Sequence, residues 1–135
     1  LHNLPEGMVI GASYAADLAE AGQDGRMMAL VIGLHNIPEG MAVAVPLAAG
    51  GASRGRAVLT TAAAGAPTVL GAVLGFCLGT MGPGLQMLTL GGASGAMLYV
   101  VFGELLPESF RLCRSPAPVM AAVLGVLTGM GVVLG

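Results

Sequence analysis

The chain has very few charged residues, and it contains no lysine and no tryptophan. Only 9% of its 135 residues are charged, whereas about a quarter of the residues in a soluble domain carry charge. A surface of this composition cannot face water, so the sequence predicts an integral membrane protein. The net charge is −2 and the five Arg are scattered, which argues against a nucleic-acid partner.

Cysteine is scarce as well. Cys77 lies inside an apolar run and Cys113 near a predicted loop, with neither CxxC nor His at a metal-binding spacing. Two such residues form neither a disulfide framework nor a zinc knuckle. Glycine, by contrast, is abundant, and membrane helices use small residues to approach each other closely. Two stripes of Gly at four-residue spacing predict packing faces: Gly71, Gly75 and Gly79, and Gly125 with Gly129.

Charged and turn-forming residues divide the chain into apolar segments. The segments cover approximately residues 1–16, 27–49, 57–80, 85–106 and 117–135. All but the first are long enough to cross a hydrocarbon core of about 30 Å as helices. Backbone groups in lipid must be paired within a segment, so each segment is predicted to be a helix. The expected fold is an all-α polytopic membrane helix bundle, a single transmembrane domain over residues 1–135 with five transmembrane segments.

The placement of Arg predicts the orientation of these segments. The loops 50–56 and 107–116 each hold two Arg, whereas the loop 80–84 has none. Under the positive-inside rule, the two Arg-rich loops are cytoplasmic and the C-terminus is outside. The first segment needs about eight to ten more apolar residues in front of it to span a membrane. We therefore expect the chain to be the C-terminal part of a longer protein.

An eight-residue sequence occurs twice in the most apolar part of the chain. Residues 1–8 read LHNLPEGM and residues 34–41 read LHNIPEGM, with seven of the eight positions identical. Ionisable groups cost several kcal/mol in hydrocarbon, so they persist there mainly for a task such as ion binding. The repeat places six polar residues in segments without any other charged residue: His2, Asn3, Glu6, His35, Asn36 and Glu39.

The spacing of these residues indicates a metal site. Residues four apart share a helix face, so His2 shares one with Glu6, and His35 shares one with Glu39. Consecutive membrane helices are antiparallel, so the two motifs can face each other at mid-membrane. Imidazole together with carboxylate suits Zn²⁺ and neighbouring first-row divalent ions, and is too rich in nitrogen for Mg²⁺ or Ca²⁺. The Pro of each copy interrupts its helix, which is typical of a transporter's central site.

Other interpretations of these residues stay open. A metal-bound water beside Glu could catalyse hydrolysis inside the membrane, although HExxH, Ser/Lys and Asp/Asp patterns are lacking in the segments. A structural or regulatory relative could also keep the motif without releasing an ion. Glu104 and Glu108 share a face near the end of segment 85–106, where they could relay metal or pair with Arg111 at the interface.

HNLPEG and HNIPEG on consecutive membrane helices resemble the fourth and fifth helices of the ZIP (Zrt/Irt-like) divalent-metal transporters, especially the bacterial and GufA-type branch. The stretch 91–100, followed by residues 104–108, resembles the seventh helix of that family. The resemblance implies helices four to eight of eight, and no enzymatic activity. It also implies that Zn²⁺, Fe²⁺, Mn²⁺, Co²⁺ or Cd²⁺ is carried toward the cytoplasm as a substrate, not held as a cofactor.

The resemblance also assigns roles to individual residues. The main metal site would consist of His2, Glu6, His35 and Glu39. Asn3 and Asn36 would lie beside a bridging Glu39 in an adjoining site. Ala66 precedes Pro67 where this branch commonly has a Glu, so we expect the adjoining site to be weakened or absent. The implied location is the bacterial cytoplasmic membrane, and the implied partners are the missing N-terminal helices and a second copy of the protein as a homodimer.

Overall fold

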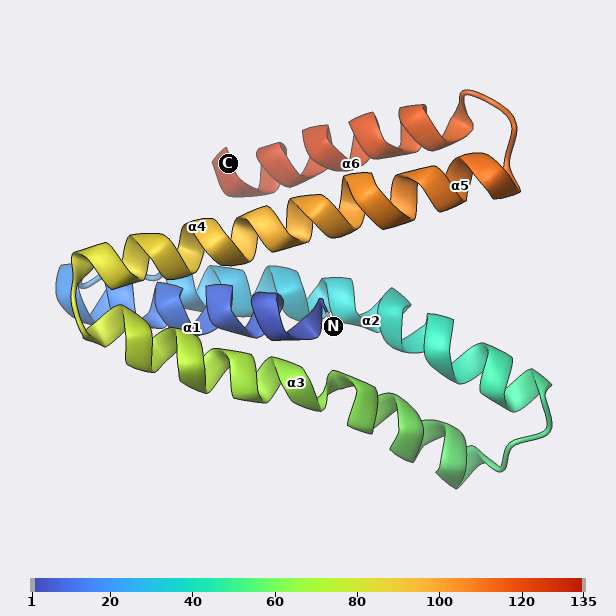
Figure 1. The fold of residues 1–135 in the computed structure, drawn as a ribbon, viewed down its shortest axis with the longest axis horizontal. Coiled ribbons are helices and arrows are strands. Elements are labelled where there is room, and N and C mark those ends of the chain that lie inside the picture. The colour runs from blue at the N-terminus through green and yellow to red at the C-terminus, as the bar shows by residue number, and fades with distance from the viewer. Residues whose placement is uncertain (1, 135) are drawn as a thin grey trace. The chain divides into compact units, whose positions relative to one another are not determined.

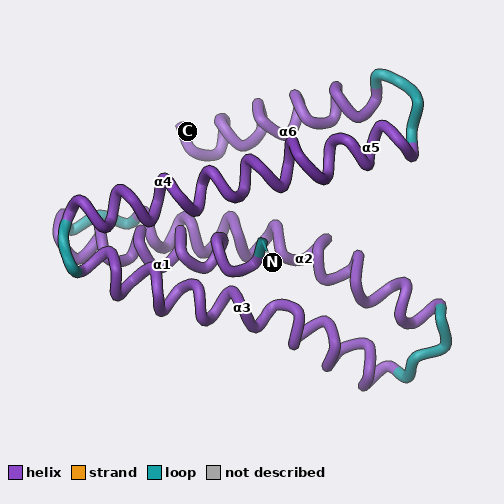
Figure 2. The backbone as a smooth tube through the Cα atoms, in the orientation of Figure 1, coloured by secondary structure: helices purple, strands orange, loops and turns teal. Residues whose placement is uncertain are grey.

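The computed structural model describes residues 2–134, and every element in that range is helical (Figure 1). The elements are α1 (Asn3–Glu20), α2 (Asp24–Ala49), α3 (Arg54–Thr80), α4 (Pro83–Tyr99), η1 (Val100–Leu105), α5 (Leu106–Leu112) and α6 (Ala117–Leu134). Short loops join the helices (Figure 2). The all-α prediction is confirmed. Leu1 of the repeat and Gly135 of the last predicted segment lie outside the described residues.

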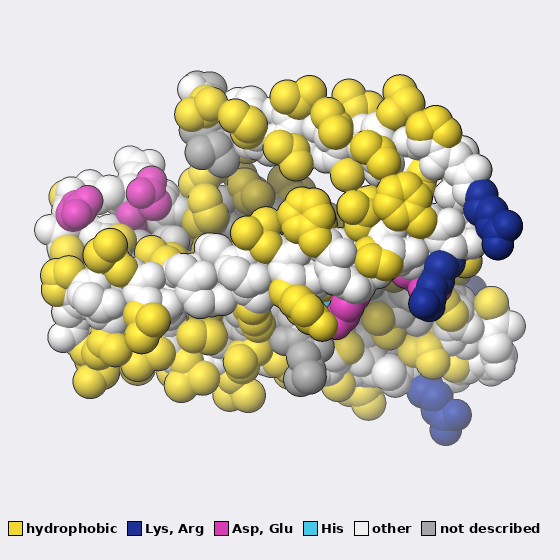
Figure 3. Space-filling model, turned by 45° about the horizontal axis from the view of Figure 1, so that its top comes forward, with side chains coloured by type: hydrophobic (Ala, Val, Ile, Leu, Met, Phe, Trp, Pro, Cys, Tyr) yellow, Lys and Arg dark blue, Asp and Glu magenta, His cyan; other side chains and the backbone are white. Residues whose placement is uncertain are grey.

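Within the described residues, three helical stretches are long and apolar enough to cross a membrane: Asp24–Ala49, Arg54–Thr80 and Pro83–Leu112. A shorter apolar helix covers Ala117–Val132. Large hydrophobic side chains stay exposed along these helices, and they are spread over the face drawn in Figure 3. Such a surface suits lipid and not water, which supports the predicted integral membrane protein. That the first and last segments also span the membrane remains a prediction.

α1 and α3 are in contact backbone to backbone. Gly7 and Gly11 of α1 are buried, as is Gly75 of α3. A Cβ on Gly7 would lie 1.9 Å from the Thr68 carbonyl oxygen, and one on Gly75 would lie 2.2 Å from the Met8 carbonyl oxygen. No side chain fits at this distance, so the packing face predicted along α3 is confirmed. The contact fixes the position of α1, which carries the first copy of the repeat.

The turn between α1 and α2 is held by one carboxylate. The backbone N–H of Asp24 donates to Asp17 Oδ1 at 2.8 Å, and that of Gly25 donates to Oδ2 at 2.9 Å. These two bonds satisfy N–H groups at the start of α2, which have no partner within the helix. The positive φ of 53° at Ala21 ends α1 just before this turn. The short connection returns α2 along α1, so that the two copies of the repeat face each other.

A small apolar cluster completes this part of the fold. Val9 of α1, Ile32 of α2 and Ala93 of α4 are buried together. Partly buried Met and Leu side chains surround them, including Met28 and Leu90. The cluster therefore connects α4 to the two helices that carry the repeat.

The contacts divide the chain into two compact units, Leu1–Met97 and Leu98–Gly135. In the second unit the helix is wider through η1, where the Leu106 N–H donates to the Val101 carbonyl, five residues back. Pro107 follows directly and has no N–H to continue the ordinary pattern, which accounts for the change in register. Nothing lies within 4 Å of a Cβ placed on Gly125 or Gly129, so the described residues give this second Gly stripe no packing partner.

An ion pair lies at the end of α5. Arg111 Nη1 is 3.6 Å from Glu108 Oε2, and both side chains are more than half exposed. An exposed pair of this kind contributes little to stability. The pair matches the interpretation in which Glu108 pairs with Arg111 at the membrane interface.

Candidate metal site

The two copies of the repeat occupy different places in their helices. Within the described residues the first copy opens α1, and the residue four before Pro5 is Leu1, which lies outside them. The second copy lies in the interior of α2, and the helix continues on both sides of Pro38. The expected interruption of the helix is therefore absent in α2. Pro38 removes a single hydrogen bond, to the Leu34 carbonyl, and the rest of a long helix tolerates that loss.

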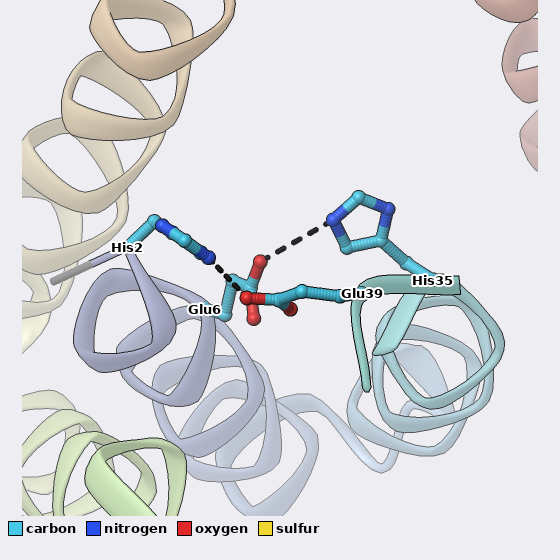
Figure 4. A network of polar contacts seen from close by, with 4 residues as sticks. All are labelled: His2, Glu6, His35 and Glu39. Carbon is cyan, nitrogen blue, oxygen red and sulfur yellow. Dashed lines mark hydrogen bonds and ion pairs between the residues drawn. The ribbon is translucent and has the colours of Figure 1, made fainter. Parts of the chain in front are cut away.

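The His and Glu side chains pair across the two helices (Figure 4). His2 Nε2 contacts Glu39 Oε1, and His35 Nε2 lies 3.5 Å from Glu6 Oε1. Each imidazole thus faces the carboxylate of the other copy. The sequence spacing correctly places His and Glu of one copy on the same face, but α1 and α2 run in opposite directions. The partner across the gap is consequently the Glu of the opposite motif.

Three of these groups form a compact set of metal ligands. One ligand atom each from Glu6, His35 and Glu39 lies within 4.8 Å of the others. Bonds from a divalent ion to nitrogen or oxygen measure about 2.0–2.2 Å, so a small inward movement lets all three groups bind one ion. The Glu6 side chain is 4% exposed and that of His35 is 62% exposed. Glu6 forms the floor of the site and His35 its open edge.

Asn36 connects the two carboxylates. A terminal atom of its amide lies 3.1 Å from Glu39 Oε2 and 3.1 Å from Glu6 Oε2. With the amide nitrogen in that position, Asn36 donates to both carboxylates. With the amide oxygen there, three oxygens converge, an arrangement that a cation stabilises. Rotation of the amide by half a turn therefore converts a hydrogen-bonded bridge into a metal ligand.

Asn3, the remaining predicted ligand, lies in the wall of a cavity beside Glu39. The cavity has a volume of about 110 Å³. Its other lining residues come from α2 and α3: Asn36, Gly40, Val43, Thr61, Ala64 and Gly65. Ala66 is exposed and is not one of the lining residues, so α3 contributes no carboxylate here.

Sequence reasoning did not identify Thr61. Its hydroxyl oxygen is buried and has no hydrogen-bond partner among the described residues. The signal in the sequence is weak, because Thr is common in membrane helices and usually bonds to the carbonyl of its own helix. The relevant fact is that Thr61 faces the second copy of the repeat, which depends on how α3 is rotated against α2.

Comparison with known proteins places the chain in a family. All of residues 1–135 match the family model described as ZIP zinc transporter. The zinc transporter GufA of Myxococcus xanthus is 44% identical over 111 residues, which cover 82% of this chain and 42% of that protein. The zinc transporter ZIPB of Bordetella bronchiseptica is 37% identical over 99% of this chain and 41% of its own length. No solved structure matches the chain.

Both relatives are transporters, and the chain spans about two-fifths of their length. The family match covers the whole chain, including both copies of the repeat and the helices that carry them. The membrane-length helices and the paired His and Glu side chains are consistent with the family that the comparisons indicate. The chain belongs to the ZIP zinc transporter family.

Proposed function

We propose that this chain forms the metal-binding C-terminal part of a longer transporter. The transporter moves Zn²⁺, or a related ion among Fe²⁺, Mn²⁺, Co²⁺ and Cd²⁺, across the bacterial cytoplasmic membrane toward the cytoplasm. The observation that carries the proposal is the crosswise pairing of His2 with Glu39 and of His35 with Glu6 between α1 and α2. Within this arrangement Glu6, His35 and Glu39 group one imidazole with two carboxylates, which are ligand types that Zn²⁺ prefers.

The polar contacts explain how these ionisable side chains can lie in an apolar surrounding when no ion is bound. An unpaired carboxylate in an apolar surrounding is very costly. Here each Glu has an imidazole partner, and Asn36 bridges Glu39 and Glu6 at 3.1 Å. An incoming divalent ion replaces these internal partners one by one. The energy of metal binding is thus partly offset by the contacts it displaces, which keeps binding reversible.

The ligand types also support reversible binding. The cluster contains no thiolate, and soft thiolate ligands are those that bind Zn²⁺ most tightly. His35 at the open edge offers an exchangeable nitrogen ligand. Asn36 joins or leaves the ion by rotation of its amide alone. A transporter needs such a ligand set, because the same ion must bind and then leave.

The proposed assembly follows from the greater length of the two related proteins. Because the chain spans about two-fifths of their length, we propose that its single transmembrane domain works together with the helices that the relatives carry in addition. A second copy of the protein is the other proposed partner, as a homodimer. Neither Asn3 nor Ala66 adds a carboxylate to the cavity beside Glu39, so we propose that one divalent ion binds strongly at a time.

A hydrolase is the less favoured alternative. Its active site would need room for a substrate next to the metal and its water. The cavity beside Glu39 has a volume of about 110 Å³, which is small against the roughly 300–1,000 Å³ of ordinary ligand pockets.

The proposal is tested by metal uptake in cells that express the full-length protein. We expect saturable Zn²⁺ uptake by the wild type and at least about a tenfold loss in Glu39→Gln, which keeps the side-chain shape and removes the charge. Glu20→Gln is the matched control, since Glu20 is exposed at the end of α1 and outside the cluster. Equal uptake by wild type and Glu39→Gln, at equal protein levels, would contradict the metal site.

A transport-inactive regulatory relative predicts a different result. It would bind Zn²⁺ in purified form, and the binding would depend on Glu39, yet the wild type would show no uptake of any of the five metals. Metal binding is therefore measured on the same variants by competition with a chromogenic chelator.

A further inference from the structure

An open groove with a volume of about 820 Å³ follows the contact between α1 and α3 near the turn into α2. It extends from Ile10 to Leu18 of α1, a distance of about 12 Å at 1.5 Å per residue. Ile10 and Val73 line the part nearer the middle of the helices, whereas Asp17 and Arg26 line the part at the turn. The groove is therefore apolar along most of its length and has one group of each charge at one end.

The apolar walls of the groove face outward. Leu18, Val73 and Phe76 all line it and are all exposed. Tyr14 lines it about one helical turn before the charged end, and a Cβ on Gly25 would lie 2.7 Å from the Cγ of this ring, so the start of α2 holds the ring in place. Tyr is enriched at the level of the lipid headgroups. The charged end of the groove is thus expected at that level, and its apolar part at the level of the acyl chains.

The two charged groups still have bonding capacity. Asp17 accepts one backbone N–H on each carboxylate oxygen, and each oxygen can accept a second donor. Arg26 takes part in none of the ion pairs among residues 2–134. It also lies in the first turn of α2, where the helix dipole disfavours a cation. Arg26 therefore favours an anionic partner, and Asp17 beside it favours a cationic donor.

These properties distinguish between the possible occupants. A further helix packed into the groove would remove Asp17 and Arg26 from water, which is costly unless both charges are paired. A small inorganic anion would match Arg26 but would leave the apolar walls uncovered. A zwitterionic phospholipid matches all three features, because its phosphate and its ammonium are neighbours on the headgroup and its acyl chains are apolar.

We propose that this groove binds a phospholipid whose headgroup carries a primary ammonium, as in phosphatidylethanolamine. The guanidinium of Arg26 donates to the phosphate, and the ammonium donates to the free acceptor positions of Asp17. One acyl chain lies along Ile10 and Val73, between α1 and α3. Under the predicted orientation, the lipid belongs to the outer leaflet. The bound lipid connects the turn between α1 and α2 to α3.

The test is lipid binding by the purified, delipidated full-length protein, measured by native mass spectrometry. An equimolar mixture of phosphatidylethanolamine and phosphatidylcholine is added, with matched acyl chains. Phosphatidylcholine has the same phosphate, but its quaternary ammonium cannot donate a hydrogen bond. We expect the wild type to retain phosphatidylethanolamine about tenfold more than phosphatidylcholine, the size of one hydrogen bond to a charged group.

Matched variants examine the two parts of the groove. Arg26→Gln should lower the retention of phosphatidylethanolamine by about tenfold, because the bond to the phosphate is lost. Arg54→Gln is its control, since Arg54 is exposed at the opposite end of α3 and does not line the groove. Val73→Trp fills the apolar part and should displace the lipid. Val69→Trp is the control on the same helix, because Val69 is also exposed but lies outside the groove.

Each outcome supports or overturns the proposal. Equal retention by wild type and Arg26→Gln would overturn the phosphate site, and equal retention of the two lipids by the wild type would overturn the role of Asp17. Retention by Val73→Trp equal to that by Val69→Trp would overturn the seat of the acyl chain. If the wild type retains no lipid and Val73→Trp alone lowers the unfolding temperature, a helix of the longer protein occupies the groove and the proposal is wrong.

Discussion

At the scale of single residues, the site balances burial against exposure. The Glu39 side chain is 22% exposed and that of Glu6 is 4% exposed, whereas the two His side chains are more open. The carboxylates therefore bear most of the desolvation cost, and the imidazoles that approach them from the opposite helix offset it. In the proposed site, an ion would meet the more exposed His side chains before the deeper Glu6. Loading would then proceed from nitrogen ligands at the edge to oxygen ligands at the floor.

This difference predicts that His35 sets the metal preference. In His35→Asp an oxygen ligand replaces nitrogen, which disfavours Zn²⁺ and suits Mn²⁺. We expect the ratio of Zn²⁺ to Mn²⁺ uptake to fall by about tenfold, the effect of one exchanged ligand of a charged ion. The exposed side chain, at 62%, makes a folding defect unexpected. The measurement is competitive uptake of the two ions by the full-length protein.

Gln23→Asp is the control for this substitution. It adds the same negative charge in the loop between α1 and α2, away from the grouped ligands. An unchanged Zn²⁺ to Mn²⁺ ratio in His35→Asp would show that His35 does not bind the transported ion. A similar fall in both variants would attribute the change to surface charge.

At the scale of helices, α1 and α3 form the closest contact of the fold. A Cβ atom would lie only 1.9 to 2.2 Å from a backbone carbonyl oxygen of the other helix if it were added to any of four glycines: Gly7, Gly11, Gly71 and Gly75. Both helices are therefore in direct contact along their backbones, and any side chain at these positions forces them apart. Because Glu6 precedes Gly7, separation of the helices would also displace the floor of the metal site.

The Gly75→Ala variant tests this contact. Its Cβ would meet the Met8 carbonyl oxygen at 2.2 Å, so we expect destabilisation of about 1–3 kcal/mol, typical of overpacking. Gly55→Ala is the matched control in the same helix, since nothing lies within 4 Å of its Cβ. That control should be neutral or gain up to about 1 kcal/mol. Thermal unfolding in detergent measures both, and equal midpoints would contradict the close contact.

The turn between α1 and α2 gives a second prediction at this scale. Asp17→Ala removes both acceptors for the Asp24 and Gly25 N–H groups, and we expect a loss of about 1–2 kcal/mol. Asp17→Asn keeps one side-chain oxygen and should lie between Ala and wild type. Unfolding of the purified protein measures the series, and Glu20→Ala is the exposed control. Identical stabilities of Asp17→Ala and Glu20→Ala would show that the two bonds do not hold the turn.

At the scale of the whole molecule, the sequence predicted the helices better than the way in which they pack against one another. Length, apolar runs and Gly spacing were sufficient for the helices and for the Gly71–Gly79 packing face, because these depend on local composition. The effect of Pro38 was overestimated, since a long helix absorbs one missing bond. The crosswise pairing of His2 with Glu39 and the burial of Thr61 depend on helix rotation and direction. No pattern within a single segment encodes those.

The large apolar surface has a consequence for how the chain sits in the membrane. On α2 alone, Leu34, Ile37, Met41 and Val45 are each 58% exposed. Lipid or further helices must cover them, because water would not. The direction in which the helices cross is then predicted from the loops that hold Arg, because cytoplasmic loops carry an excess of Lys and Arg.

Native Cys113 reports on that direction. It is exposed in the loop between α5 and α6, beside Arg111 and Arg114, so the positive-inside rule predicts that it faces the cytoplasm. With Cys77 replaced by Ala, a membrane-impermeant thiol reagent should label Cys113 in inside-out vesicles and leave it unlabelled in intact cells.

The converse reporter is Gln23→Cys in a background with both native Cys replaced by Ala. Gln23 is exposed in the turn between α1 and α2, so it should be labelled in intact cells. Labelling of Cys113 in intact cells, with Gln23→Cys protected there, would reverse the assigned direction.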